Sequence, residues 1–328
     1  MLGVIRGSAK AHSALYAGLF AGNVLCNKYV LSELEFTYPT IFQGWQVLVG
    51  ACFLKGIATC SGTAVVKSSL DKPGFISLLP TFLLFVGTLV AGSKALAVIE
   101  VPQFVACLNL SPALIYLFDD APKFRNSQCG AVVACAVVVL STVGLVVLEL
   151  EMTFSDSPYF WMLICVLCAS VHIVHGRIAD ARFEPVDRLY YSYLVGVCLL
   201  APASLYLDEA FQALNFAKNS RFHFFVGCLA SGFFGVTSCY IAATLTPTGE
   251  EAPGTNDGSE FMGIFQNVGK CLAALLSIFA FQQKAAVTGW ILVCVMFNLI
   301  AGFFIPVPKD PTAEVGFKPL PTFVSSPE

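Results

Sequence analysis

The sequence predicts an all-α polytopic membrane protein with ten transmembrane helices, arranged as two inverted halves of five helices each. Of its 328 residues, 57% are hydrophobic and only 12% are charged, which is about half the charge of a typical soluble domain. The apolar residues gather in runs close to the ~20 residues that cross a bilayer. An odd number of spans in each half forces the halves into opposite orientations, as in an inverted repeat.

The predicted spans divide the chain into an N-terminal half, 1–148, a linker, 149–157, and a C-terminal half, 158–305. The proline-rich segment 306–328 is predicted to be a disordered cytosolic tail. No clear sequence similarity links the halves, so the repeat is inferred from the count alone. In chain order, the spans cover roughly residues 12–31, 40–59, 76–96, 101–118, 129–148, 158–177, 189–207, 222–244, 259–281 and 288–305.

Basic residues in the loops predict the orientation. With the N-terminus in the cytosol, cytosolic segments carry eleven Lys and Arg residues and the opposite loops carry three. This bias favours both termini in the cytosol. The loop 246–258 should also be cytosolic yet carries acidic residues and no basic one. Acidic residues count little in this rule, so the assignment stands.

The ninth span carries a lysine near its middle. On a helical wheel, Lys270 shares one polar face with Gln266 and Asn267, opposite an apolar face. A charge at that depth costs roughly 3 kcal/mol, so such a residue usually faces a water-filled cavity or a ligand. We therefore expect Lys270 to face an anion. A snorkelling lysine, or a segment at the membrane surface, is the alternative.

Polar side chains elsewhere leave two interpretations open. In the first span, Asn23 and Asn27 share a face with His12 and Tyr16, and they predict either a cavity wall or interhelical hydrogen bonds. Lys94, which ends the third span, could bind a second negative charge or anchor at the interface.

Three tyrosines open the seventh span. Tyr190 and Tyr193, with Ser192 between them, could stack on a base or form an interfacial aromatic belt.

Several functions are not expected. Cys165 and His175 share a helix face with two further potential ligands, but ten residues of helix span about 15 Å, too far for one metal ion. The sequence places no catalytic triad or paired carboxylates, and the glycines before Lys270 do not fit a phosphate-binding loop. We expect no enzyme activity, no metal and no cofactor. The net charge of -3 also argues against nucleic acid.

Three stretches carry a family resemblance: NKYVLSELEFTYPTIFQGWQVLVG at 27–50, FVGTLVAGSKAL at 85–96 and FHFFVGCLASGFFG at 222–235. Through them the chain resembles the nucleotide-sugar transporters of the drug/metabolite transporter superfamily. The resemblance covers about residues 12–305 and implies ten spans with both termini in the cytosol. It also implies transport of a nucleotide sugar into the Golgi lumen in exchange for a nucleoside monophosphate.

The GDP-mannose transporters of that superfamily read guanine with a Phe-Tyr-Asn-Asn motif in the seventh span. The matching residues here, 190–193, are Tyr-Tyr-Ser-Tyr and lack both asparagines. Lys270 matches the lysine of their ninth-span Gly-Ala-Leu-Asn-Lys motif, although the nearest asparagine here is Asn267. Their fourth-span Lys-Asn pair is matched by Leu108 and Asn109, so one lysine is lost. The resemblance thus favours a uridine nucleotide sugar.

From the resemblance we expect an antiporter that brings UDP-N-acetylglucosamine, or another UDP-sugar, into the Golgi in exchange for UMP. Lys270 would neutralise the diphosphate, Asn267 and Gln266 would hydrogen-bond sugar or phosphate, and Tyr190 or Tyr193 would pack near the base. The alternatives are a carrier of GDP-mannose or of a phosphorylated metabolite, and a non-transporting membrane scaffold. An endoplasmic reticulum location and a homodimer also stay open. The expected substrate-binding residues are Lys270, Asn267, Gln266, Lys94, Tyr190, Tyr193, Asn23, Asn27 and Asn109.

Overall fold

The computed structural model describes most of the chain, and every regular element in those residues is a helix. The predicted tail from residue 307 onward and residues 150–156 of the predicted linker lie outside the described part. The described residues are 2–61, 68–119, 129–149, 157–178, 183–216, 222–245, 257–281 and 289–306.

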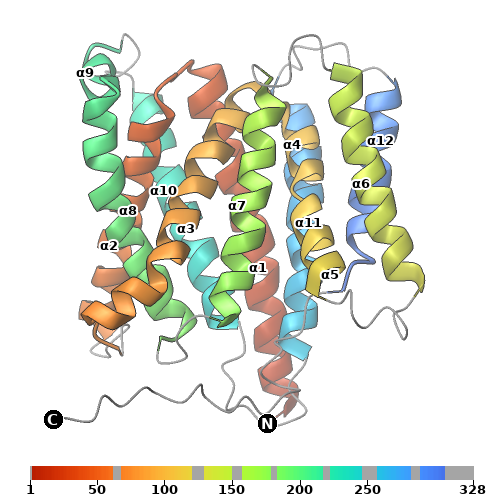
Figure 1. The fold of residues 1–328 in the computed structure, drawn as a ribbon, viewed down its shortest axis with the longest axis horizontal. Coiled ribbons are helices and arrows are strands. Elements are labelled where there is room, and N and C mark those ends of the chain that lie inside the picture. The colour runs from red at the N-terminus through yellow and green to blue at the C-terminus, as the bar shows by residue number, and fades with distance from the viewer. Residues whose placement is uncertain are drawn as a thin grey trace, which may run out of the picture.

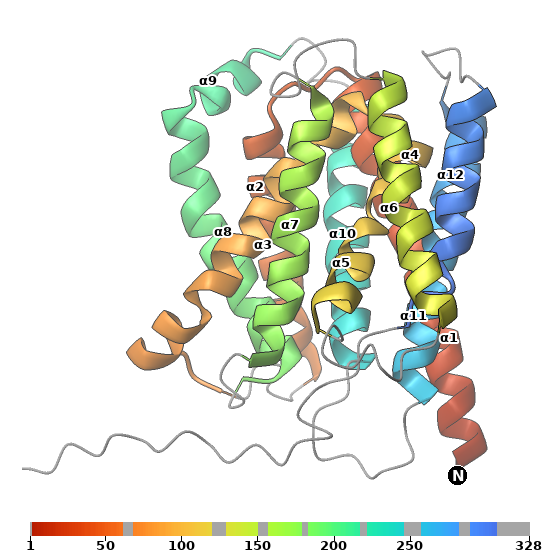
Figure 2. The ribbon, with the colours of Figure 1, turned by 45° about the vertical axis from the view of Figure 1, so that its right-hand side comes forward.

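The long helices stand side by side, while α9 crosses one end of the bundle (Figures 1 and 2). The elements are α1 (Leu2–Lys28), the π-helix η1 (Tyr29–Glu33), α2 (Pro39–Ser61), α3 (Lys72–Val98), α4 (Val101–Cys107), α5 (Leu110–Asp119), α6 (Cys129–Glu149), α7 (Pro158–Ile178), α8 (Pro185–Tyr206), α9 (Glu209–Leu214), α10 (Phe222–Leu245), α11 (Asp257–Ala280) and α12 (Gly289–Gly302).

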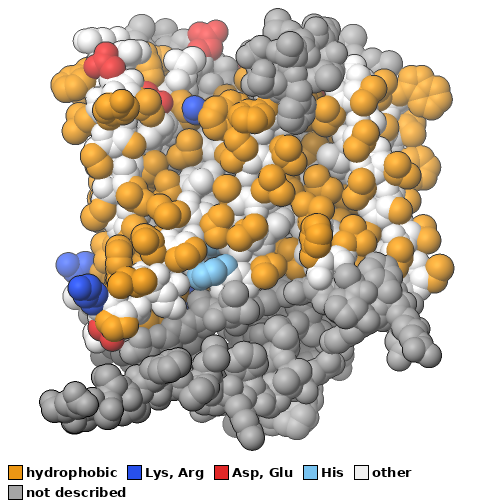
Figure 3. Space-filling view, viewed as in Figure 1, with side chains coloured by type: hydrophobic (Ala, Val, Ile, Leu, Met, Phe, Trp, Pro, Cys, Tyr) orange, Lys and Arg blue, Asp and Glu red, His pale blue; other side chains and the backbone are white. Residues whose placement is uncertain are grey.

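Among the described residues, seven helical segments are long and apolar enough to cross a membrane: α3, α4 with α5, α6, α7, α8, α10 and α11. The helix α12 is apolar but shorter, with 14 residues. Large apolar side chains face outward on these helices, including Leu140 at 71% exposed and Phe279 at 85% exposed. On the face shown in Figure 3, apolar side chains cover the middle and charged ones lie near the ends. Such a surface suits lipid and would be a liability in water.

The prediction of an all-helical membrane protein is therefore confirmed, whereas the ten-span count stays a prediction. Some boundaries differ from the predicted spans. The helix α1 begins at Leu2, before the predicted start at residue 12, because a helix can continue past the end of its apolar run. The helix α12 ends at Gly302, three residues before the predicted end at 305.

The predicted fourth span is broken into α4 and α5, which follow one another end to end (Figure 1). The break lies at Leu108–Asn109, four and three residues before Pro112. Proline has no N–H, and its ring collides with the carbonyl four residues earlier. The Leu108 carbonyl instead accepts a 3.3 Å hydrogen bond from the Ser111 N–H. Proline thus places an irregular turn, and with it Asn109, in the middle of the bundle.

The helix contacts fall into matching pairs. If the first five long segments (α1, α2, α3, α4–α5, α6) are exchanged with the last five (α7, α8, α10, α11, α12), the α3–α7 contact becomes α10–α1. In the same way α2–α10 becomes α8–α3, and α1–α11 becomes α7–α5, and all of these contacts exist. The pairs α2–α8 and α6–α12 map onto themselves and lie at opposite edges of the bundle (Figure 1). Two repeated halves of five helices, whether parallel or inverted, would produce these pairs.

Candidate functional site

Lys270 of α11 is buried, with 9% of its surface exposed. Its ammonium donates a 2.6 Å hydrogen bond to Oδ1 of Asn109 and a longer one, 3.3 Å, to Oδ1 of Asn267. The snorkelling alternative is wrong, because the side chain ends among amides inside the bundle. Among the described residues, no carboxylate contacts the ammonium. The site therefore holds a positive charge that neutral groups solvate but do not cancel.

Helices distant in sequence meet at this lysine. Asn109 comes from the turn between α4 and α5 and is completely buried. Asn267 lies one turn before Lys270 on α11 and donates a 2.8 Å hydrogen bond to the Gly302 carbonyl, at the end of α12. The structure thus brings together three of the predicted residues, Lys270, Asn267 and Asn109.

Sequence reasoning missed Asn298 of α12, which is also completely buried. The Asn109 amide nitrogen donates to its Oδ1 at 3.1 Å. The Asn298 amide nitrogen in turn donates to the hydroxyls of Ser141 and Thr142 on α6, at 2.9 and 3.1 Å. The available signal was an asparagine inside the otherwise apolar run VCVMFNLIAG. A polar residue in such a run needs a partner on another helix.

Two further predicted residues stand apart from this network. Gln266 precedes Asn267 on α11 and is partly buried. Lys94 of α3 places its ammonium 4.0 Å from the ring centre of Trp161 on α7, a cation–π contact. No hydrogen bond among the described residues joins Lys94 to Asn109 or Asn267, the two amides that hold Lys270. Lys94 therefore does not share the amide cluster that holds Lys270.

The polar stripe of α1 joins three helices. Gln46 of α2 donates to Oδ1 of Asn23 at 3.0 Å and to Oδ1 of Asn27 at 3.4 Å. Ser231 of α10 donates to the same Asn27 oxygen at 2.5 Å. The sequence left open whether Asn23 and Asn27 line a cavity or make interhelical hydrogen bonds. In this structure they make interhelical hydrogen bonds.

The two predicted tyrosines of α8 lie in an apolar cluster between α2, α3, α8 and α10. Tyr193 is 4% exposed and packs its ring 5.4 Å from that of Phe85, centre to centre. Its ring also occupies the space over Gly50, where an added Cβ would come within 2.2 Å of a ring carbon. Tyr190 is partly buried in the same cluster. In this conformation Tyr193 is a packing residue.

A second buried lysine has a structural role. Lys28, at the end of α1, is 2% exposed and donates to the carbonyls of Leu96 and Ile99, at 3.2 and 2.9 Å. These carbonyls belong to the last turn of α3 and the residue after it, where unsatisfied acceptors and the helix dipole favour a cation. Lys28 and Lys270 are thus matched in burial and differ in what they contact.

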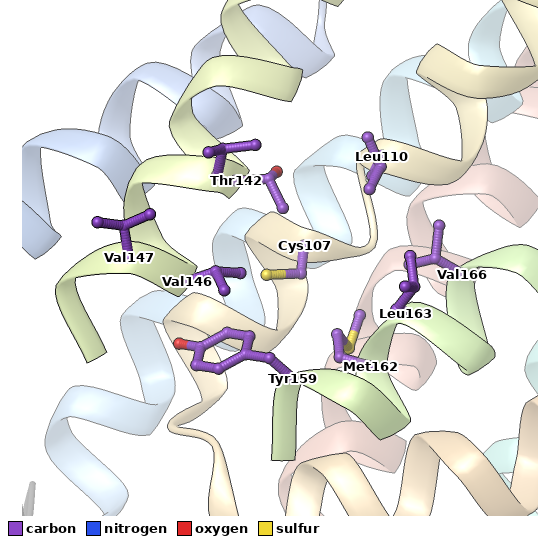
Figure 4. A pocket seen from close by; sticks show the side chains of 10 residues that line it. Cys107, Leu110, Thr142, Val146, Val147, Tyr159, Met162, Leu163 and Val166 are labelled. Atoms are coloured by element: carbon purple, nitrogen blue, oxygen red, sulfur yellow. The ribbon is translucent and has the colours of Figure 1, made fainter. Parts of the chain in front are cut away.

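A groove lined by described residues lies on α6, α7 and the α4–α5 turn (Figure 4). Its lining is apolar, and the outer wall includes Val147, which is 67% exposed. Such a groove suits lipid chains and does not contain Lys270. It is therefore not the polar cavity that the sequence predicts.

The close approach of α12 to Asn109 gives a stability prediction for Gly302→Ala. A Cβ on Gly302 would lie 2.8 Å from Nδ2 and 3.1 Å from Cγ of Asn109. That amide is hydrogen-bonded on both sides, so it cannot move without losing bonds. We expect overpacking to lower the free energy of unfolding by about 1–3 kcal/mol, measured as thermal unfolding of the purified protein in detergent.

The matched control for this variant is Gly289→Ala, at the start of the same helix, where nothing lies within 4 Å of the added Cβ. The control reports the general effect of replacing glycine by alanine in α12. Equal melting temperatures for the two variants would show that Asn109 is not confined at Gly302.

Comparison with known proteins gives named relatives, although no family model matches the chain. This chain is 33% identical over 212 residues to the UDP-N-acetylglucosamine transporter TMEM241 of Mus musculus, and the alignment covers 64% of this chain and 70% of the relative. It is 32% identical over 218 residues to the UDP-N-acetylglucosamine transporter TMEM241 homolog of Xenopus laevis, covering 66% and 72%.

More distant matches include GDP-mannose transporter 1 of Neosartorya fischeri, 25% identical over 261 residues, covering 71% of this chain and 66% of that relative. A solved crystal structure aligns with 92% of this chain and 97% of its own, with a TM-score of 0.54 and 17% sequence identity. At this identity the match shows a shared fold.

Proposed function

This chain belongs to the nucleotide-sugar transporter family, and from that premise we propose that it exchanges UDP-N-acetylglucosamine for UMP across the Golgi membrane. One observation carries the proposal: the ammonium of Lys270 is buried and held by neutral amide oxygens. A buried positive charge with no carboxylate partner among the described residues suits a ligand that brings negative charge with it. A nucleotide diphosphate supplies that charge, and lysine binds phosphate well as a point charge.

The proposed binding mode uses the predicted residues according to where they lie. The diphosphate contacts Lys270, while Asn267 and Gln266 of the same helix hydrogen-bond phosphate or sugar. Asn109 completes the amide cluster around the charge. Tyr190 or Tyr193 packs near the base when the apolar cluster around them opens during transport. The ammonium is the centre of this arrangement.

Alternating access between two five-helix halves is the proposed mechanism. The pairing of helix contacts under exchange of the halves supports it. So does the α4–α5 break, because interrupted helices that line a central site are common in transporters. The proposed orientation keeps both termini in the cytosol, following the basic residues of the loops.

The choice of uridine over guanosine rests on two differences. The relatives named as UDP-N-acetylglucosamine transporters are 33% and 32% identical, whereas the GDP-mannose transporter of Neosartorya fischeri is 25% identical. The Tyr190–Tyr193 stretch also lacks the two asparagines that resemblance associates with guanine. The match to GDP-mannose transporters makes GDP-mannose the second candidate substrate.

The test is exchange in proteoliposomes loaded with UMP and offered labelled UDP-N-acetylglucosamine outside. We expect uptake that depends on internal UMP and is blocked by external UDP but not by GMP. Inhibition by GMP with uptake of GDP-mannose would shift the proposal to the second substrate. Folded, reconstituted protein that takes up neither nucleotide sugar would contradict the transport proposal itself.

A further inference from the structure

The hydrogen bonds that end at Lys270 begin in the backbone of α6. The Ser141 hydroxyl donates to the Val137 carbonyl at 2.6 Å, and the Thr142 hydroxyl donates to the Val138 carbonyl at 2.8 Å. A hydroxyl has one hydrogen to donate. Both side chains therefore present only lone pairs to their neighbour on α12, Asn298.

These lone pairs fix the direction of the Asn298 amide. Its nitrogen donates to both hydroxyls, at 2.9 and 3.1 Å, and to the Val138 carbonyl at 3.2 Å. Its oxygen must then point the other way, where the Asn109 nitrogen donates to it at 3.1 Å. A rotated Asn298 amide would set its oxygen against the Val138 carbonyl, and the two hydroxyls would have to give up their bonds to the α6 backbone to donate to it, which is unfavourable in a buried site.

The orientation of the Asn298 amide in turn sets the orientation of the Asn109 amide, which faces Lys270. Because the Asn109 nitrogen faces Asn298, its oxygen faces Lys270 and accepts from the ammonium at 2.6 Å. A rotated Asn109 amide would place N–H groups opposite the ammonium. Both asparagines are 0% exposed, so water does not compete for their hydrogen bonds.

We propose that Asn298 is a positioning residue for substrate binding: it orients Asn109, and Asn109 holds the Lys270 ammonium ready for an anion. This inference rests on the proposed role of Lys270 in binding the nucleotide. No hydrogen bond in the described part of the chain joins Asn298 directly to the ammonium, so it would act through Asn109. An ammonium carries three N–H groups, and two of them are held by Asn109 and Asn267. A group held in place before binding loses less freedom when the ligand arrives.

The test measures uptake of UDP-N-acetylglucosamine by the full chain in UMP-loaded liposomes. Asn298→Leu removes the amide at similar volume. We expect KM to rise about tenfold, the scale of one lost buried hydrogen bond, with Vmax changed less than twofold. Asn109→Ala should raise KM similarly. If Asn298 acts only through Asn109, the double variant should be no worse than Asn109→Ala alone.

Two further variants serve as an alternative perturbation and as a control. Thr142→Val is nearly isosteric and removes one acceptor of the Asn298 amide. Thr142→Val should raise KM about two- to threefold, and only while Asn109 is present. This variant tests the proposal even if Asn298→Leu fails to fold. The matched control is Gln43→Leu. Gln43 is 1% exposed and donates to Ser93 on another helix at 2.5 Å. No chain of hydrogen bonds in the described residues links it to Lys270, so KM should stay unchanged.

Each outcome has a distinct meaning. A double variant with KM about a hundredfold above that of the parent would show additive effects and overturn the positioning role. An unchanged KM in both Asn298→Leu and Thr142→Val would also overturn the positioning role. In that case an inactive Lys270→Ala variant would still support the proposed role of Lys270 in substrate binding. Full activity of Lys270→Ala would instead contradict the proposed binding site.

Discussion

We expect that replacing Lys270 by alanine abolishes nucleotide-sugar exchange while the protein still folds. The ammonium is the positive charge at the centre of the amide cluster. A charge pair about 4 Å apart at the effective dielectric of a protein site contributes on the order of 4 kcal/mol, which is roughly a thousandfold in affinity. Uptake should therefore fall to the level of protein-free liposomes. Lys270→Arg keeps the charge but not the shape, so it should lose less.

Stability should respond differently from transport. Burying the Lys270 charge costs roughly 3 kcal/mol of stability, which the substitution regains. The substitution also leaves the Asn109 oxygen without its donor, which costs about 1–3 kcal/mol. These effects oppose each other, so the melting temperature should change little. Lys28→Met is the matched comparison: it deprives the Leu96 and Ile99 carbonyls of their donor and should lower the melting temperature. Full exchange by Lys270→Ala would refute the proposed site.

Asn109→Asp is expected to have the second largest effect. The new carboxylate would lie where the amide oxygen accepts from Lys270 at 2.6 Å, so it would cancel the charge and repel a phosphate. Repulsion at about 5 Å amounts to roughly 3 kcal/mol at the same dielectric, or more than a hundredfold in affinity. Binding of UDP-N-acetylglucosamine to the purified protein measures this directly.

The comparison for this variant is Asn109→Ala, which removes the same oxygen without adding charge. We expect the aspartate to weaken binding at least tenfold more than the alanine. Equal losses would mean that the net charge at the site is unimportant, and that Asn109 acts through its hydrogen bonds alone.

Lys270 could be recognised from the sequence because a charge inside an apolar run has few explanations. Asn109 on the fourth span was predicted as a binding residue by resemblance, but the break of that span beside it was not predicted, although Pro112 explains it. Asn298 was missed because one helical wheel shows which residues share a face but not which helix packs against it. The same limit left Asn23 and Asn27 undecided until Gln46 and Ser231 were seen beside them.

Tyr193 shows a different limit. A tyrosine near a span end suits a binding site, an aromatic belt or a packed core equally well. The choice depends on Gly50 of another helix, whose missing side chain makes room for the ring. Such complementary pairs are distant in sequence, so composition and periodicity do not reveal them. Helix existence was predictable because apolar runs are local features.

The neutral surroundings of Lys270 also bear on how an unloaded carrier would behave. Once a nucleotide leaves, the ammonium has lost its anionic partner, because the groups that hold it among the described residues are amide oxygens. Reorienting in that state would move an unpaired charge through a low-dielectric interior, whereas a bound nucleotide pairs it with a phosphate. The empty protein should then reorient slowly and the loaded protein quickly. Slow return of the empty form would couple the inward and outward movements of nucleotide and so favour one-for-one exchange.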